Sequence, residues 1–262
     1  MDLQLAGKHV LVTGASRGIG LAIVRAFQEE GASVTATARR STPELDATGA
    51  AFVPADLATA DGPQRMVDAV LALGPGIDVL VNNAGGGEVP QEVFGDPLNG
   101  GDDVWATAFT LNLHATVRTT RAALPSLLEA KGAVVNISSD SARRPGAEPL
   151  PYSVAKAAVN AFTRQLAERV APSGVRVNAV SPSATRTPQI TGEDGYIAHV
   201  ADSMGVGHGT LVAALPKRTG MLTETLIEPA EIARAVLLLA SPTMPSAIGA
   251  NWFVDAGATK TV

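Results

Sequence analysis

Residues 8–20 read KHVLVTGASRGIG, and this stretch decides the fold. Its first part, 8–13, is rich in β-branched and aliphatic residues and predicts a buried strand, while 19–30 predicts the helix that follows it. Glycines between the two permit a tight turn and let backbone amides approach a ligand. Because a helix N-terminus carries unpaired N–H groups and a partial positive charge, a glycine turn in this place predicts a site for the phosphates of a nucleotide.

Short β-branched runs alternate with longer amphipathic stretches along the rest of the chain. Strands are predicted at 33–38, 51–55, 77–82, 133–138, 174–181 and 251–254, and helices at 61–73, within 103–130 with a bend at Pro125, at 152–170 and at 229–241. This alternation predicts one α/β domain over 1–262, a doubly wound, Rossmann-type parallel sheet of about seven strands with helices on both faces.

Two irregular stretches, 85–102 and 184–225, each follow a predicted strand. Ligands bind beyond the carboxyl ends of the strands in such sheets, so we expect both stretches beside a ligand, the second as a lid. The alternative is that they are surface insertions.

Composition excludes several classes of function. The 262 residues have a formal net charge of −5 without a cluster of Lys or Arg, so no nucleic-acid partner is expected. Cysteine is absent and the four histidines lack metal-ligand spacing, so we expect no disulfide, thiolate nucleophile or metal. The start of the chain does not resemble a secretory signal, and no apolar run approaches the roughly 18 residues of a membrane span. We therefore expect a cytoplasmic protein without a membrane partner.

A second pattern carries candidate chemistry. Tyr152 and Lys156 are four residues apart in a predicted helix and share one face of it. A tyrosine with its ordinary pKa, about 10, is a poor base at neutral pH, and a nearby ammonium group would stabilise the phenolate and lower that pKa. This spacing also arises in ordinary helices. Its weight comes from Ser139, thirteen residues before Tyr152, at the end of a predicted strand.

The motifs, in this order, resemble those of the short-chain dehydrogenase/reductase family, in its shorter subgroup. The resemblance covers the length of the chain and rests on TGASRGIG at 13–20, NNAG at 82–85, Asn112, Ser139, Tyr152 with Lys156, SP at 181–182 and VDAG at 254–257. It implies an oxidoreductase that moves hydride between a nicotinamide and a carbonyl or secondary alcohol.

The resemblance also implies roles for single residues. Tyr152 would be the general acid or base, Ser139 would hold the substrate oxygen, and Lys156 would tune Tyr152 and bind the nicotinamide ribose. Ser138 and Ser141 are competitors for the serine role, but the spacing to Tyr152 favours Ser139.

Further positions would support the reaction or bind the cofactor. Asn112 would support a water-linked proton path to the lysine, or would hold a kink in its helix. The cofactor-binding residues that the resemblance implies lie in the glycine turn, after the second, third and fourth strands, in the catalytic pair and after the sixth strand: Gly14, Ser16, Arg17, Gly18, Ile19, Gly20, Arg39, Asp56, Leu57, Asn83, Ala84, Gly85, Tyr152, Lys156, Pro182, Thr185 and Thr187.

The end of the second predicted strand indicates which nicotinamide is bound. A carboxylate there binds the ribose hydroxyls of NAD, but here the position holds Ala38, followed by Arg39, and Arg17 lies in the glycine turn. Arginines in these places favour the 2′-phosphate, so we expect NADP(H) to be preferred over NAD(H). The alternative is that Arg17, Arg39 and Arg40 are solvated surface charges. Asp56 resembles the residue that faces the adenine amino group, and could equally cap the following turn.

The substrate cannot be identified from the sequence. Its pocket walls are expected from 85–102, 140–151 and 184–225, and several of their residues indicate a largely apolar site: Val89, Phe94, Leu150, Ile190, Tyr196 and Met204. Ser183 stands where the family usually has glycine, which restricts the backbone and leaves the path of the following loop open. Thr187 stands in the place of the family threonine that faces the nicotinamide amide.

Other functions fit the same fold. One is a ketoreductase for a carrier-bound 3-oxoacyl chain, for which Arg143, Arg144, Lys217 and Arg218 could dock an acidic carrier or could simply be solvated. Halohydrin dehalogenases resemble the family but replace the lysine, and related enoyl reductases place tyrosine and lysine farther apart, so both fit less well. A non-catalytic NADP(H)-binding protein is a third alternative, although such proteins usually lose a catalytic residue.

The resemblance also implies a homotetramer. The predicted helix 152–170 carries small and apolar residues compatible with close packing against a second copy: Ala157, Ala158, Val159, Ala161 and Phe162. We therefore expect a small carbonyl or alcohol substrate and further copies of the chain as the partners.

Overall fold

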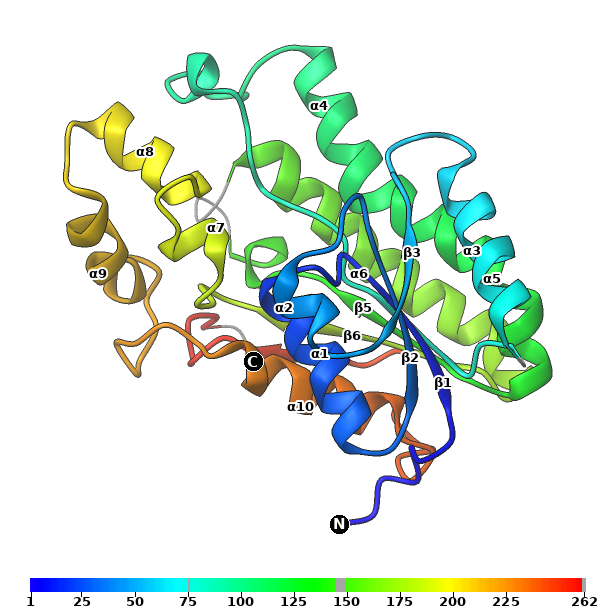
Figure 1. Ribbon diagram of the computed structural model, residues 1–262. Coiled ribbons are helices and arrows are strands. Elements are labelled where there is room, and N and C mark those ends of the chain that lie inside the picture. The colour runs from blue at the N-terminus through cyan, green and yellow to red at the C-terminus, as the bar shows by residue number, and fades with distance from the viewer. Residues whose placement is uncertain (75, 145–148, 261–262) are drawn as a thin grey trace.

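The computed structural model, described here for residues 1–74, 76–144 and 149–260, is built on one seven-stranded sheet (Figure 1). The strand order is β3-β2-β1-β4-β5-β6-β7 and every neighbouring pair is parallel. The strands are β1 (His9–Thr13), β2 (Ser33–Ala38), β3 (Ala51–Pro54), β4 (Val79–Asn82), β5 (Ala133–Ile137), β6 (Arg176–Pro182) and β7 (Asn251–Val254). The order reverses direction between β1 and β4, so the predicted doubly wound, Rossmann-type fold is confirmed.

Helices cover both faces of the sheet (Figure 1). On one face, α1 (Gly18–Glu29) and α10 (Pro229–Ala240) pack on Val10 and Val12 of β1. On the other, α3 (Gly62–Leu73), α5 (Ala115–Ala130) and α6 (Leu150–Val170) share a core with Leu11. Successive side chains of a strand point to opposite faces of the sheet. Because β1 is apolar at successive positions, the sheet lies between two hydrophobic layers.

The predicted helix over 103–130 is three consecutive segments. These are α4 (Asp102–Phe109), a π-helical turn η2 (Thr110–His114) and α5, and Pro125 lies inside α5. A π turn inserts one extra residue into the helical ladder, which rotates the side chains that follow it. Asn112 lies in this turn and is fully buried.

The stretch 184–225 contains helices that its weak periodicity did not predict. They are α7 (Pro188–Thr191), α8 (Tyr196–Met204) and α9 (His208–Arg218), coloured yellow to ochre in Figure 1. All are short and separated by glycines, which hides the helical period in the sequence. The other irregular stretch, 85–102, holds the single 3₁₀ turn η1 (Gln91–Val93) before α4 begins. A four-residue helix, α2 (Pro43–Asp46), also escaped prediction.

Within the part of the chain that the structure describes, no helix combines the length and apolar character that a membrane crossing requires.

Candidate active site

The glycine turn is fixed to the end of β4. The Thr13 hydroxyl accepts hydrogen bonds from the backbone N–H groups of Asn83 and Ala84, each at 3.0 Å, and the Asn83 amide donates to the carbonyls of Thr13 and Gly14 at 2.9 and 3.0 Å. A Cβ at Gly14, where φ is +63°, would lie 2.8 Å from the Ala84 Cα, and one at Gly20 would lie 2.3 Å from the Gly14 oxygen. Side chains are therefore excluded at these two positions, and the backbone of the turn stays accessible from the cleft.

The N-terminus of α1 is suited to an anion. Arg17 is its N-cap and forms no side-chain cap, and the first turn carries no acidic residue. The first N–H groups of the helix are therefore directed at the cleft without a carboxylate beside them, as a phosphate site requires.

Exposed cations lie in the glycine turn and directly after β2. Arg17 and Arg39 are exposed, line the cleft, and form no ion pair among the described residues, and Ala38 supplies no carboxylate. Asp56 also lines the cleft, but its Oδ1 accepts the N–H of Ala58 at 3.0 Å. Asp56 thus caps the following turn, as the alternative expected, and it does so with one of its two carboxylate oxygens.

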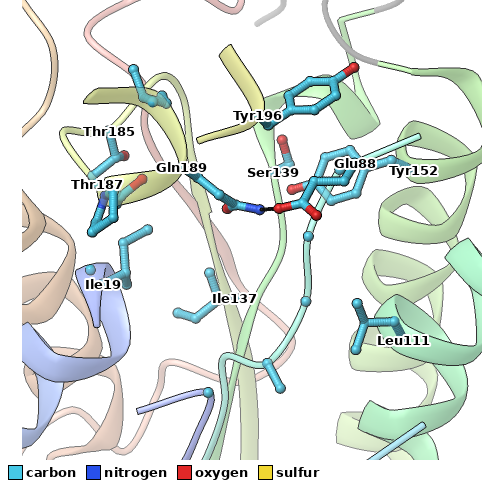
Figure 2. Close-up of a pocket in the computed structure, with 18 of the residues that line it drawn as sticks. Ile19, Glu88, Leu111, Ile137, Ser139, Tyr152, Thr185, Thr187, Gln189 and Tyr196 are labelled. Carbon is cyan, nitrogen blue, oxygen red and sulfur yellow. Dashed lines mark hydrogen bonds between the residues drawn. The ribbon is translucent and has the colours of Figure 1, made fainter. Parts of the chain in front are cut away.

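Ser139, Tyr152 and Lys156 come together at the end of β5. Figure 2 shows Ser139 and Tyr152 directed into the same part of the pocket. The Ser139 Oγ accepts hydrogen bonds from the N–H and the hydroxyl of Ser141 at 3.2 and 2.9 Å, so Ser141 orients Ser139. Ser138 donates to the carbonyl of Lys156 at 3.3 Å and is held away from that role.

Lys156 is buried beside Tyr152. Only 4% of its surface is exposed, its Nζ lies 5.6 Å from the centre of the Tyr152 ring, and it donates to the carbonyl of Ile137 at 2.8 Å. Burial lowers the pKa of Lys156 to about 8. A Cβ at Gly85 would lie 3.2 Å from the Lys156 Nζ and 2.7 Å from the Asn112 Oδ1, so glycine is needed there for the lysine to reach this position.

Asn112 lies behind the cleft and does not line it. Its amide donates to the carbonyls of Gly86 and Ala108 at 2.9 and 3.0 Å, and its Oδ1 accepts the N–H of Gly86 at 3.0 Å. The side chain therefore holds the π turn and ties it to the backbone after β4, as the kink alternative expected. A role in proton transfer stays a prediction.

One cleft at the carboxyl end of the strands collects the rest of the predicted site. It has a volume of about 2190 Å³, and it is lined by Ser139 and by every residue that the resemblance implied for cofactor binding. Small-molecule pockets usually measure roughly 300–1,000 Å³, so this cleft has room for a dinucleotide and a substrate together.

The substrate side of the cleft is less apolar than the sequence indicated. Most of the expected residues line it, namely Val89, Phe94, Ile190, Tyr196 and Met204, and Phe94 packs edge-on against Tyr196 with ring centres 6.0 Å apart. Leu150 does not line it, because it lies at the surface end of α6. Glu88 and Gln189, which the sequence analysis missed, also lie there and are hydrogen-bonded to each other (Figure 2).

Two of the four proposed carrier-docking cations have other partners. Arg144 forms an ion pair with buried Asp140, with Nη2 2.8 Å from Oδ2, directly after Ser139 in the chain. Arg143 lies over the ring of Phe253, 5.4 Å from its centre. Lys217 and Arg218 form no ion pair within the described ranges.

Comparison with known proteins agrees with this geometry. A family model described as enoyl-(acyl carrier protein) reductase matches residues 14–259. The chain is 34% identical to the L-fucose dehydrogenase of Bos taurus over 92% of its own length and 86% of that protein. It is 31% identical to a 3-oxoacyl-(acyl-carrier-protein) reductase of Chlamydia pneumoniae over 99% of this chain and 100% of that one.

Among solved structures, the L-sorbose reductase of Gluconobacter frateurii, complexed with NADPH and L-sorbose, matches with a TM-score of 0.88 and 29% identity over 100% of both chains. The family model covers most of the sequence, and the relatives are similar along nearly their whole lengths. This chain therefore belongs to the short-chain dehydrogenase/reductase family and is an oxidoreductase of alcohols and carbonyls.

Proposed function

We propose that this protein is an NADP(H)-dependent enzyme that reduces a carbonyl, or oxidises a secondary alcohol, with Tyr152 as the general acid or base. One observation carries the proposal: the glycine turn lines the same cleft as Ser139, Tyr152 and Lys156. A dinucleotide held by its phosphates at the N-terminus of α1 would extend along the carboxyl ends of the strands towards these side chains.

Each of the proposed catalytic residues has a separate task. When bound, the nicotinamide supplies the hydride for the carbonyl carbon. The Ser139 hydroxyl, oriented by Ser141, holds the carbonyl oxygen, and Tyr152 donates the proton to it. With a pKa of about 8, Lys156 is mostly an ammonium at neutral pH. It stabilises the phenolate that Tyr152 becomes after it donates its proton. Asn112 positions the backbone around Gly86 that borders the lysine.

The preference for NADP(H) is supported by charge. Arg17 and Arg39 offer exposed guanidinium groups at the cleft, and Ala38 leaves out the carboxylate that would repel a 2′-phosphate. We would test this first by calorimetric titration with NADPH and with NADH. Tighter binding of NADPH is expected. Tighter binding of NADH would contradict the cofactor assignment and leave the catalytic residues in place, whereas binding of neither would contradict the whole proposal.

The non-catalytic alternative is separated from the enzyme by turnover. An NADPH sensor would bind the cofactor without consuming it, whereas the enzyme consumes NADPH only when a carbonyl is added. A panel of ketones and aldehydes, followed at the absorbance of NADPH, decides between the two.

The carrier-bound ketoreductase remains a second candidate because of the similarity to a 3-oxoacyl-(acyl-carrier-protein) reductase. The engagement of Arg143 with Phe253 and of Arg144 with Asp140 leaves only Lys217 and Arg218 for an acidic carrier. Turnover of an acetoacetyl thioester on a carrier protein, compared with the same thioester on a short thiol, measures whether the carrier contributes.

We further propose a single-domain protein that acts as a homotetramer in the cytoplasm, where NADPH is available, with 184–225 covering the substrate. An exposed apolar stripe on α6 supports the assembly: Leu150, Val154, Ala157 and Ala161. This spacing places the four side chains on one helix face, which suits packing against a second copy. Light scattering at micromolar concentration would show a tetramer, and a monomer would contradict this part.

A further inference from the structure

Glu88 is a carboxylate in the substrate half of the cleft. Figure 2 shows it in the same part of the pocket as Ser139, Tyr152 and Tyr196. It lies in the loop that follows β4, and it lines the cleft together with those three residues. Glu88 is exposed to the cleft, and a carbonyl oxygen held by Ser139 and Tyr152 would place the rest of the substrate in the same part of it.

The Glu88 side chain is oriented from the opposite wall. The Gln189 amide on α7 donates to its Oε1 at 3.0 Å. The two residues are 101 positions apart, so this bond joins the loop after β4 to the stretch 184–225. An amide donor fixes the carboxylate without neutralising it.

Glu88 forms no ion pair among the residues that the structure describes. Among the arginines that line the cleft, Arg144 is paired with Asp140, and Arg218 forms no ion pair with Glu88. A carboxylate loses stability when an apolar group covers it, repels an anionic group, and gains from a hydroxyl that donates to it. At the position of Glu88, an apolar or anionic substrate group is therefore disfavoured relative to a hydroxyl group.

We infer that Glu88, oriented by Gln189, is a substrate-recognition residue that accepts a hydrogen bond from a hydroxyl group of the substrate. The preferred substrate is an uncharged carbonyl compound that carries hydroxyl groups, as a keto-polyol does. This inference rests on the proposed function and names its substrate class.

A kinetic test uses three four-carbon ketones. L-erythrulose carries a hydroxyl on each carbon except the carbonyl carbon, 2-butanone carries no hydroxyl, and acetoacetate carries a carboxylate. The ratio of kcat/KM for erythrulose to that for butanone is measured with NADPH in the wild type, Glu88→Gln and Glu88→Leu. We expect the ratio to fall about tenfold or more in Glu88→Leu and less in Glu88→Gln, which keeps an acceptor oxygen. Glu88→Gln should raise kcat/KM for acetoacetate relative to butanone, a gain that damage to the fold would not produce.

A matched control removes the same charge nearby. Glu92 lies in η1, four residues after Glu88, and does not line the cleft. Glu92→Gln is expected to leave all three ratios at the wild-type values. Gln189→Leu should lower the erythrulose-to-butanone ratio without raising the relative activity on acetoacetate, because it frees the carboxylate but keeps its charge. An equal loss of kcat/KM for erythrulose and butanone in Glu88→Leu would mean that Glu88 only joins the loop after β4 to α7, and would overturn the inference.

A binding test separates this inference from the proposed function. Calorimetry compares erythritol with 2-butanol on the wild type and on Glu88→Leu, with and without saturating NADP⁺. Preference for erythritol that Glu88→Leu abolishes supports the inference even if none of the ketones is turned over, an outcome that would count against the proposed reaction alone. Equal binding of the two alcohols to the wild type, or binding of neither, would overturn it.

Discussion

The Lys156 ammonium lies 5.6 Å from the centre of the Tyr152 ring while it donates a hydrogen bond to the carbonyl of Ile137. The lysine is thus anchored by the backbone at the end of β5, and Ser139 lies two residues after that end. Because one strand end positions both residues, Lys156, which we propose assists Tyr152, and Ser139, which we propose holds the substrate oxygen, are fixed relative to each other. Rigid support of this kind lowers the cost of aligning a reacting carbonyl.

Replacing Tyr152 with Phe tests the assignment of the proton donor. The ring is kept and only the hydroxyl is lost, so folding and NADPH binding should stay close to the wild type. Turnover should fall by about 10²–10⁴-fold, the usual contribution of a general acid or base. Steady-state kinetics beside calorimetry with NADPH provide the measurement. A variant that retains near-normal turnover would show that another group supplies the proton.

Burial of Lys156 makes a prediction about stability against pH. Its pKa is lowered to about 8 in the folded protein, whereas an unfolded lysine has a pKa of about 10.4. Between these values the unfolded state binds more protons, so the free energy of unfolding should rise with pH, by up to about 3 kcal/mol. Below pH 8 the full penalty of burying the charge remains.

The matched variant for this prediction is Lys156→Met, which keeps the length of the side chain and removes the titration. Urea unfolding from pH 7 to 10.5 should show a rise in the wild type relative to the variant, and the variant should be the more stable of the two at pH 7. Parallel stability curves would mean that folding leaves the pKa of the lysine unchanged. Activity should be low in Lys156→Met at every pH.

Removal of the Arg39 charge should affect one cofactor only. In Arg39→Ala the Kd for NADPH is expected to rise about tenfold, since a charge-assisted hydrogen bond contributes roughly 1.5–3 kcal/mol, while the Kd for NADH should change little. Arg25 provides a control, because it is on α1, does not line the cleft and, among the described residues, donates only to the carbonyl of Glu44 at 3.5 Å. A similar loss for both cofactors in Arg39→Ala would indicate a structural effect.

The strands could be predicted because their signals are local. Each predicted strand is present with ends within two residues of the prediction, since apolar β-branched runs bounded by turns leave few alternatives. The residues expected to bind the cofactor line the cleft, because the glycine turn and the ends of β2 to β4 adjoin predicted strands. That they bind a cofactor stays a prediction. In 184–225 the helices were missed, since α7 has a single turn and α8 and α9 are separated by glycines.

The substrate side could not be predicted, because its contacts are long-range. Glu88 and Gln189 lie in two irregular stretches, and nothing in either stretch indicates that an amide of one meets a carboxylate of the other. Leu150 was placed in the pocket for its apolar character, but the path of the chain turns it to the surface. For Asn112 the sequence left a proton path and a helix kink open, and the structure shows its side chain hydrogen-bonded to the backbone at the π turn.

Arg176 is another long-range contact with a measurable consequence. It is 9% exposed on β6, and its guanidinium donates to the carbonyls of Leu239 and Ala240 at 2.6 and 2.7 Å, at the C-terminal end of α10. The last carbonyls of a helix have no partner within it, so Arg176 satisfies two of them. Arg176→Met should therefore lower the free energy of unfolding by about 1–3 kcal/mol, the cost of a buried acceptor left unsatisfied.

The control for Arg176 is another arginine with a close partner. Arg164 pairs with Glu168 at 2.7 Å, but the two side chains are 63% and 61% exposed, so Arg164→Met should cost about 0–1 kcal/mol. Urea midpoints of the two variants, taken at one pH, make the comparison. Equal midpoints would mean that water replaces the guanidinium at the end of α10 and that the helix does not depend on β6 for its C-terminal cap. A clear difference would identify Arg176 as the residue that couples the last helix to the sheet.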